Sequence, residues 1–204
     1  MRTEVRSASR ADVDAASLVL ANAFTDYAWT RWTVDAEDHV ERVRGLQQLF
    51  IDRVALPYGE VWVALDEDGE LVSVAVWMLP NSTVPGSVLN EIDHDQAALE
   101  GGRHEASVEA EAFVSQLRPR SSHYYLGAVG TRRDRQRHGY GAAVLAPVLR
   151  RAHVENTRVF LETSASENVH FYMGLGFSTV AEVDVPDGGP HVWAMTRAGR
   201  DAVQ

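Results

Sequence analysis

Four arginines stand close together ahead of two glycines, in a chain whose formal net charge is −10: Arg132, Arg133, Arg135 and Arg137. Gly139 and Gly141 allow the backbone to turn tightly and to approach a ligand without a Cβ in the way. An apolar run at 142–153 predicts a helix directly afterwards, and the free amides and positive dipole end of a helix N-terminus attract anions. The sequence therefore predicts that a small anionic group, such as a phosphate, binds at this turn.

Two common phosphate-binding motifs do not fit this turn. A dinucleotide fingerprint, G-x-G-x-x-G, needs a third glycine where this chain has Val144. A P-loop needs a lysine, and the chain contains none, because all 19 basic residues are arginine. The spacing that does fit is Gln136-x-x-Gly139-x-Gly141 between a predicted strand and a predicted helix. It resembles the acetyl-coenzyme A signature of the GNAT superfamily of N-acetyltransferases.

The resemblance extends along nearly the whole chain. The stretches AFTDY, LQQLF, SVAVW, FLETSASENVHFYMGLGF and VWAMTR resemble, in this order, the puromycin N-acetyltransferases, which acetylate the free amine of an aminonucleoside antibiotic. The resemblance implies a mixed α/β fold of the GNAT type, in which helices flank a central V-shaped mixed sheet. It also implies that the sheet is splayed between its fourth and fifth strands, which in this sequence are 123–131 and 158–164.

The same resemblance implies where acetyl-CoA binds. Backbone groups of the fourth strand would contact the pantetheine arm at Val129, Gly130 and Thr131. Gln136 belongs to the signature, and the pyrophosphate would be held by the backbone N–H groups of the residues that follow it: Arg137, His138, Gly139, Tyr140, Gly141 and Ala142. Asn168 stands where the superfamily often has an asparagine that touches the cofactor. Arg133 and Arg137 replace a proline and a glycine that are usual in the superfamily, and both can add positive charge near the phosphates.

Acetyl transfer from a thioester to an amine requires a neutral amine, donors for the oxyanion and a proton for the departing thiolate. Glu162, near the end of an apolar strand, is the candidate base, because partial burial raises the pKa of a carboxyl group; the alternative is an ordinary paired glutamate. Tyr172 is the candidate acid, since the superfamily often has a tyrosine near the sulfur; the alternative is an aromatic ring packed beside Phe171 and Phe177. The oxyanion donor would be a backbone N–H near Val129, at a strand bulge.

Aromatic side chains are the candidates for the acceptor site: Tyr27, Trp29 and Trp32 in a loop between the first two helices, and Trp77 at the end of a strand. Aromatic faces suit a flat amine or its cation, although aromatics at helix ends usually pack in the core or its rim. We expect a small-molecule primary amine as acceptor, with a puromycin-like aminonucleoside favoured. The alternatives are a peptide N-terminus, a polyamine or an aminoglycoside, and a non-catalytic acyl-CoA-binding module.

The predicted elements place these residues in one acetyltransferase domain across 1–204. Strands are expected at 3–8, 60–65, 71–79, 123–131, 158–163, 178–185 and 191–197. The pair Asp68-Gly69 predicts a hairpin between the second and third strands. The strand–helix–strand order of 123–163 predicts a parallel pair with a right-handed crossover. A helical insert is expected at about 83–118, interrupted at Gly101-Gly102.

The composition of the chain argues against several classes of ligand and partner. Cysteine is absent, so disulfides and thiolate metal sites are excluded, and no histidine pair has the H-x-x-x-H spacing of a helical metal site; we predict no metal. Net acidity argues against nucleic-acid binding. No apolar stretch is long enough to span a bilayer, and the N-terminal residues do not resemble a signal peptide. We therefore expect a cytoplasmic protein without membrane contact, either a monomer or a homodimer.

Overall fold

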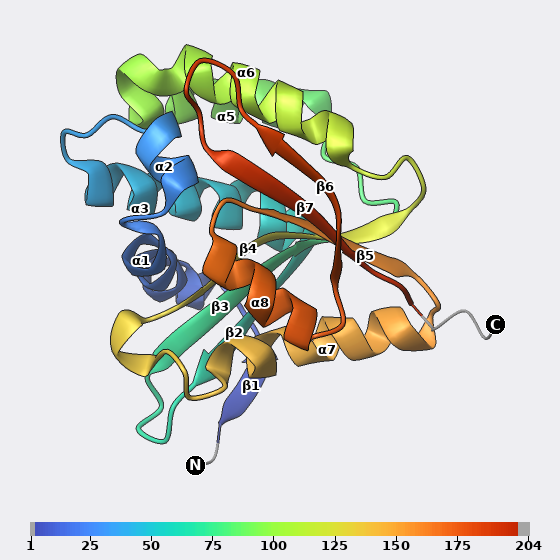
Figure 1. Ribbon diagram of the computed structural model, residues 1–204. Coiled ribbons are helices and arrows are strands. Elements are labelled where there is room, and N and C mark those ends of the chain that lie inside the picture. Colours follow the sequence, from blue (N-terminus) through green and yellow to red (C-terminus); the bar gives the residue numbers. More distant parts are fainter. Residues whose placement is uncertain (1–2, 200–204) are drawn as a thin grey trace.

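The computed structural model describes residues 3–199, and seven of their segments form one mixed sheet (Figure 1). The spatial order is β1-β2-β3-β4-β5-β7-β6. The strands are β1 Glu4–Ser7, β2 Gly59–Leu65, β3 Leu71–Met78, β4 His123–Thr131, β5 Arg158–Thr163, β6 Ser178–Asp184 and β7 His191–Arg197. These bounds agree with the predicted strands to within two residues, because each strand is a short apolar run between turn residues.

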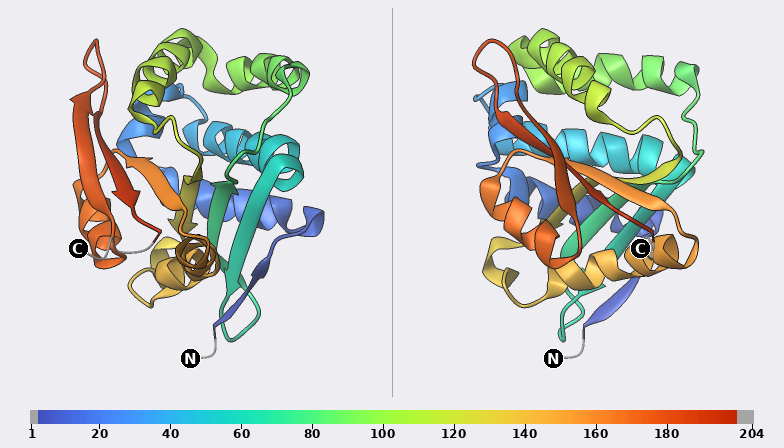
Figure 2. Two further views of the ribbon diagram at one scale, coloured as in Figure 1. Left: turned by 90° about the vertical axis from the view of Figure 1, so that its right-hand side faces the viewer. Right: turned by 45° about the vertical axis from the view of Figure 1, so that its right-hand side comes forward.

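The short pairing between the two central strands gives the sheet its V shape. Strands β4 and β5 are parallel, but they pair only between His123–Leu126 and Arg158–Leu161. The remaining neighbours, including the β2–β3 hairpin at Gly69 (φ +79°), pair antiparallel. Beyond Leu126 the two central strands diverge, and Figure 2 shows β5 to β7 turning away from the β1–β4 half. The mixed sheet predicted from the sequence, with its splay between the fourth and fifth strands, is confirmed.

Helices cover both faces of the sheet. On one face, α1 (Val13–Phe24) and the π-helical turn after α3 (His39–Phe50) pack on the β2–β3 hairpin through Leu20, Ile51 and Val74, and α3 packs against α1. The α3 helix continues through a π-helical turn, Ile51–Ala55, into α4 (Leu56–Tyr58). On the other face, α7 (Tyr140–Val154) and α8 (Ser166–Gly174) pack on a core that contains Leu145 and Trp77. No helix within residues 3–199 is long and apolar enough to cross a membrane.

The segment between the first two long helices is a short helix, α2 (Ala28–Thr33), and our prediction of a loop there is wrong. Its threonines supply the reason. The Thr30 hydroxyl donates to the carbonyls of Phe24 and Tyr27, and the Thr33 hydroxyl donates to the carbonyl of Trp29. Both threonines are buried, so the turn is held by side-chain bonds that a pattern of apolar residues does not reveal.

Helical residues occupy the expected insert. They form α5 (Gly86–Glu100), a 3₁₀ turn at Gly101–Arg103, α6 (His104–Val114) and a second 3₁₀ turn at Ser115–Leu117. The interruption falls at Gly101, whose φ of +65° lies in the left-handed region that glycine tolerates. In Figure 1, α6 lies above the β6–β7 hairpin, and Val114 packs with Val185 and Val192 of that hairpin.

Candidate active site

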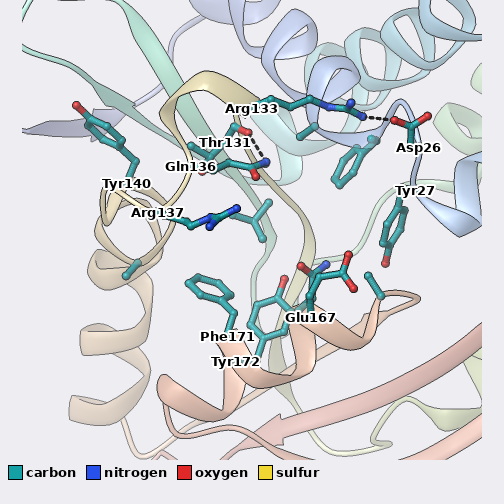
Figure 3. A pocket seen from close by; sticks show the side chains of 18 of the residues that line it. Asp26, Tyr27, Thr131, Arg133, Gln136, Arg137, Tyr140, Glu167, Phe171 and Tyr172 are labelled. Carbon is teal, nitrogen blue, oxygen red and sulfur yellow. Dashed lines mark hydrogen bonds and ion pairs between the residues drawn. The ribbon is translucent and has the colours of Figure 1, made fainter.

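The divergence of β4 and β5 opens a cavity of about 1050 Å³ (Figure 3). Its walls come from segments that are far apart in the sequence: residues 23–28, the end of β4 and the loop after it, the start of α7, and residues 164–172 with Trp193. All of the predicted cofactor-binding residues except His138 line this cavity: Val129, Gly130, Thr131, Gln136, Arg137, Gly139, Tyr140, Gly141, Ala142 and Asn168. The imidazole of His138 is exposed and its Nδ1 lies 2.7 Å from the carbonyl oxygen of Gln136.

The turn into α7 has the backbone that an anion cradle requires. Gly139 precedes the helix with φ +84°, and Arg137 has φ +62°, so two residues of this turn are left-handed. A Cβ on Gly141 would lie 3.4 Å from the Phe171 ring and 3.6 Å from the Thr131 hydroxyl, which is tight packing. The amides of the first helical turn have no partners within the helix and point to this space. The turn thus offers amide donors at a place that side chains leave open.

Carboxylates neutralise three members of the arginine cluster. Arg132 pairs with Asp134 at 2.7 Å, Arg133 with Asp26 at 2.6 Å, and Arg135 with Asp66 at 3.3 Å. Arg137 forms no ion pair with any residue between 3 and 199. Figure 3 shows its guanidinium extending across the cavity above Phe171, so its charge is available to a ligand there.

Tyr172 is a packed aromatic residue that also lines the cavity. Its ring packs between Phe171 and Phe177, with centroids 5.2 and 5.7 Å away, and the residue is 5% exposed. It also lines the cavity, and in Figure 3 its hydroxyl points into that space. Burial, with a smaller effect of the Tyr27 phenol, raises the pKa of Tyr172 far above its usual value. The phenol is protonated at neutral pH, as an ordinary tyrosine is, and the raised pKa makes it a weaker acid than an exposed tyrosine.

Tyr27 closes the cavity at the end of β5. Its hydroxyl accepts the backbone N–H of Ser164 at 2.6 Å and lies 3.2 Å from the Thr163 hydroxyl. The Asn168 amide donates to the same Thr163 hydroxyl at 3.2 Å. These bonds connect the start of α2 to the end of β5 and the start of α8, so the two segments that flank the cavity are linked by hydrogen bonds.

Glu162 lies on the opposite face of β5 from Thr163 and does not line this cavity. Its Oε1 accepts from Nε of Arg118 at 3.0 Å, and its Oε2 accepts from the Tyr125 hydroxyl at 2.7 Å. Burial raises the pKa of Glu162, while the charge and hydrogen bonds of Arg118 and the bond from Tyr125 act in the opposite direction. Phe160, two residues before Glu162, lies on the same face of β5, where its ring stacks on Tyr125 at 6.3 Å between centroids.

The comparison with known protein families shows which family this chain belongs to. Residues 21–177 match the model of the acetyltransferase (GNAT) family. The chain is a GNAT acetyltransferase. The match covers more than half of the chain and includes the cavity residues of β4, the α7 turn and α8, and members of this family typically use acetyl-CoA.

Solved GNAT structures share this fold over almost the whole chain. A Corynebacterium glutamicum structure described as histone acetyltransferase HPA2 and related acetyltransferase has 25% identity and a TM-score of 0.75, covering 97% of this chain and 96% of that one. Drosophila melanogaster polyamine N-acetyltransferase has 16% identity and a TM-score of 0.60, with coverage of 97% and 100%. Arylalkylamine N-acetyltransferase 2 from Aedes aegypti has 10% identity and a TM-score of 0.62, with coverage of 98% and 100%. The finer resemblance to puromycin N-acetyltransferases stays a prediction.

The GNAT sheet places three of the four predicted acceptor aromatics away from the cavity. Trp77 is fully buried in the core under α7, and its assignment to substrate binding is wrong, because strand alternation turns it to the face that packs on that helix. Trp32 carries the Arg103 guanidinium 4.1 Å from its ring centroid. Trp29 packs with Val114 in the cluster between α6 and the β6–β7 hairpin. Tyr27 alone of these four lines the cavity.

Several residues around the cavity and around Glu162 gave no recognisable signal in the sequence. Phe171 lies against Gly141, and Trp193 reaches the cavity from β7. Arg118 and Tyr125 hold Glu162, yet Arg118 is 44 positions away from it in the chain. The small residues after β5, at 164–166, are the one signal that sequence reasoning missed, since small side chains after a buried strand leave room for a ligand.

Proposed function

We propose that this chain transfers an acetyl group from acetyl-CoA to the primary amine of a small molecule, with a puromycin-like aminonucleoside as the favoured acceptor. The observation that carries the proposal is the cavity in the splay of β4 and β5. It joins amide donors and an unpaired Arg137 at one end to the Tyr172 hydroxyl at the other. A phosphate-bearing ligand with a reactive group at its far end matches this distribution of charge.

The residues present fit coenzyme A. The first-turn amides of α7 and the guanidinium of Arg137 would hold the diphosphate, because both favour negative charge. The absence of a Cβ at Gly141 leaves room beside Phe171 and Thr131. Main-chain groups of Val129 and its neighbours have no partner in β5, because the pairing of β4 with β5 ends at Leu126. These groups would bind the amide-bearing arm of the cofactor.

Three groups of this chain would carry the chemistry. Acetyl-CoA, when bound, supplies a thioester carbonyl that an amine attacks. Glu162 would accept the amine proton, directly or through water, because a carboxylate with a raised pKa is a stronger base at neutral pH. Tyr172 would protonate the departing sulfur. A backbone N–H near Val129 would stabilise the oxyanion, and the expected bulge in β4 occurs at Gly127, where Val76 pairs with Ala128 and Trp77 pairs with Leu126.

The acceptor is proposed from the resemblance and from the side chains at the splay. Phe24 and Tyr27 supply aromatic surface on the cavity wall, and Tyr125 supplies it on the Glu162 side. A peptide N-terminus, a polyamine or an aminoglycoside is the alternative acceptor class. Structures whose descriptions name a polyamine or an arylalkylamine acetyltransferase share the fold at 16% and 10% identity. A non-catalytic acyl-CoA-binding module would require neither Glu162 nor Tyr172.

Two measurements test the proposal. Acetyl-CoA is expected to raise the midpoint of thermal unfolding, because a ligand that binds only the folded state stabilises it. Release of free thiol from acetyl-CoA is then followed with puromycin and with a panel of polyamines, aminoglycosides and peptides. No stabilisation at millimolar acetyl-CoA would refute the cofactor assignment. Stabilisation without thiol release from any amine would favour the binding module.

A further inference from the structure

Arg118, the residue directly after the helical insert, joins three elements through one side chain. Its Nε donates to Oε1 of Glu162 at 3.0 Å, and its Nη2 donates to the Tyr125 hydroxyl at 3.0 Å. The same Nη2 donates to Oε1 of Glu111 in α6 at 2.7 Å. The guanidinium carbon also lies 4.5 Å from the centroid of the Tyr125 ring. The end of the insert is thereby fixed to β4 and β5 at the position of Glu162.

Opposing effects set the ionisation of Glu162. Its side chain is 10% exposed, and this burial is the main cause that raises its pKa. Arg118 counteracts burial through its charge and its hydrogen bonds, and Tyr125 does so through one hydrogen bond. Glu111 faces the group from α6 and raises the pKa, and the Tyr27 phenol lies within electrostatic range. Arg118 is thus a positive charge that opposes the effect of burial on the pKa of Glu162.

Stability alone gives a poor reason for a charge at position 118. Removing two charges from water costs several kcal/mol, and apolar residues of similar volume often stabilise a protein equally well. The insert already has apolar contacts with the rest of the fold, through Ala110 and Val114 against Val185 and Val192. Arg118 is therefore one of several contacts that hold the insert in place. It is also the residue whose guanidinium contacts Glu162.

The Glu162 carboxylate adjoins the place where β4 is open. Gly127 is exposed although its strand lies inside the sheet, and it is the bulged residue of β4. The direction of its missing Cβ points to the rings of Tyr125 and Phe50, at 3.7 and 3.9 Å. Because the Tyr125 hydroxyl donates to Oε2 of Glu162, the carboxylate is held by the same ring that lies next to Gly127.

We propose that Arg118 is a positioning residue, which holds Glu162 as a carboxylate directed at the opening beside Gly127. The inference rests on the proposed function, in which Glu162 takes the proton of the acceptor ammonium. In that step the N–H bond breaks, its electron pair stays on nitrogen, and the proton forms an O–H bond on Glu162 before it passes to solvent. Arg118 touches neither the amine nor the thioester, so it acts through Glu162 alone.

The deciding experiment titrates Glu162 directly. Glutamate is labelled with carbon-13 at the side-chain carboxyl, and the Glu162 signal is assigned by its loss in Glu162→Gln. In Arg118→Gln, which keeps a donor but removes the charge, we expect the titration midpoint to rise by about 1–2 pH units. Arg118→Lys keeps the charge and loses the two-point contact, so an intermediate midpoint is expected. Glu111→Gln removes the exposed partner of Arg118 and is expected to lower the midpoint slightly.

The outcomes separate a positioning role from a structural one. A folded Arg118→Gln with an unchanged Glu162 midpoint overturns the inference; if that variant does not fold, an unchanged midpoint in Arg118→Lys overturns it equally. With puromycin as the probe amine, the acid limb of kcat/KM should move by the same amount as the carbon-13 midpoint. Thermal stabilisation by acetyl-CoA should be the same in each variant. Its absence from the unaltered protein would refute the proposed function and leave the titration of Glu162 still readable.

Discussion

Arg137 provides the sharpest test of the cofactor site, because its replacement by glycine should stabilise the free protein and at the same time weaken the binding of acetyl-CoA. Its backbone is left-handed, with φ +62°, a conformation that costs a non-glycine residue about 1–2 kcal/mol. Glycine removes this cost but loses about 0.5–1 kcal/mol more conformational entropy on folding. The balance predicts that Arg137→Gly stabilises the free protein by about 0.5–1 kcal/mol. The unfolding midpoint should then rise by about 1–4 °C.

The same substitution should weaken acetyl-CoA binding. The guanidinium is exposed and extends over the cavity, so its pairing with a phosphate is worth about 1 kcal/mol, or roughly a fivefold increase in Kd. Calorimetric titration at low and at high salt measures this, and the difference from the unaltered protein should shrink at high salt. Coenzyme A lacking the 3′-phosphate shows which phosphate is contacted: an equal loss for both ligands indicates the diphosphate.

Two control variants isolate the causes. Arg137→Ala removes the charge and keeps the left-handed backbone strain, so it should lose the same affinity without the gain in stability. Arg132 belongs to the same cluster, but it pairs with Asp134 and does not line the cavity, so Arg132→Ala should bind acetyl-CoA normally. Unchanged affinity of Arg137→Gly at low salt would refute the proposed contact between this guanidinium and the cofactor. An unchanged unfolding midpoint would show that the turn is not strained.

Three further predictions concern the chemistry and the stability of the chain. Tyr172→Phe should lower kcat by about 10²–10⁴-fold with little change in acetyl-CoA affinity; an unchanged kcat in a steady-state assay would remove Tyr172 as the acid. Glu162→Gln should move the rate optimum to higher pH, because the amine must then lose its proton to solvent; an identical pH profile would exclude Glu162 as the base. Asp12 bonds Arg6 and the Ser9 amide, and the pairing with Arg6 holds the pKa of Asp12 below its usual value. Its stabilising effect is therefore full above the unfolded-state pKa and is lost as pH falls through the folded-state pKa. Asp12→Asn should cost about 1 kcal/mol at pH 7, and in thermal melts the difference should disappear in strong acid; a constant difference would contradict this assignment.

The sequence predicted the strands and the glycine turn before α7 well because their determinants are local. The turn at 136–141 lies within six consecutive residues, where glycine spacing and the start of a helix fix the backbone. Trp77 shows the limit of such reasoning. Its position at the end of an apolar strand is equally compatible with the core or with a ligand site, and only the helix packed on that face decided between them. The short helix α2 was missed for a related reason, since the Thr30 hydroxyl inside it donates to the carbonyls of Phe24 and Tyr27 before the helix.

By itself the sequence determined that a strand, a glycine turn and a helix follow one another at 123–154, because these features depend on neighbouring residues. Tertiary structure decided which arginine side chains near this turn pair with carboxylates and which extend into the cavity. Arg132, Arg133 and Arg135 meet carboxylates, two of them from other parts of the chain, whereas Arg137 does not. Tertiary structure also brought Arg118 to Glu162 across 44 positions. Ionisation and charge pairing depend on burial and on distances in space, and no local pattern of residues specifies either.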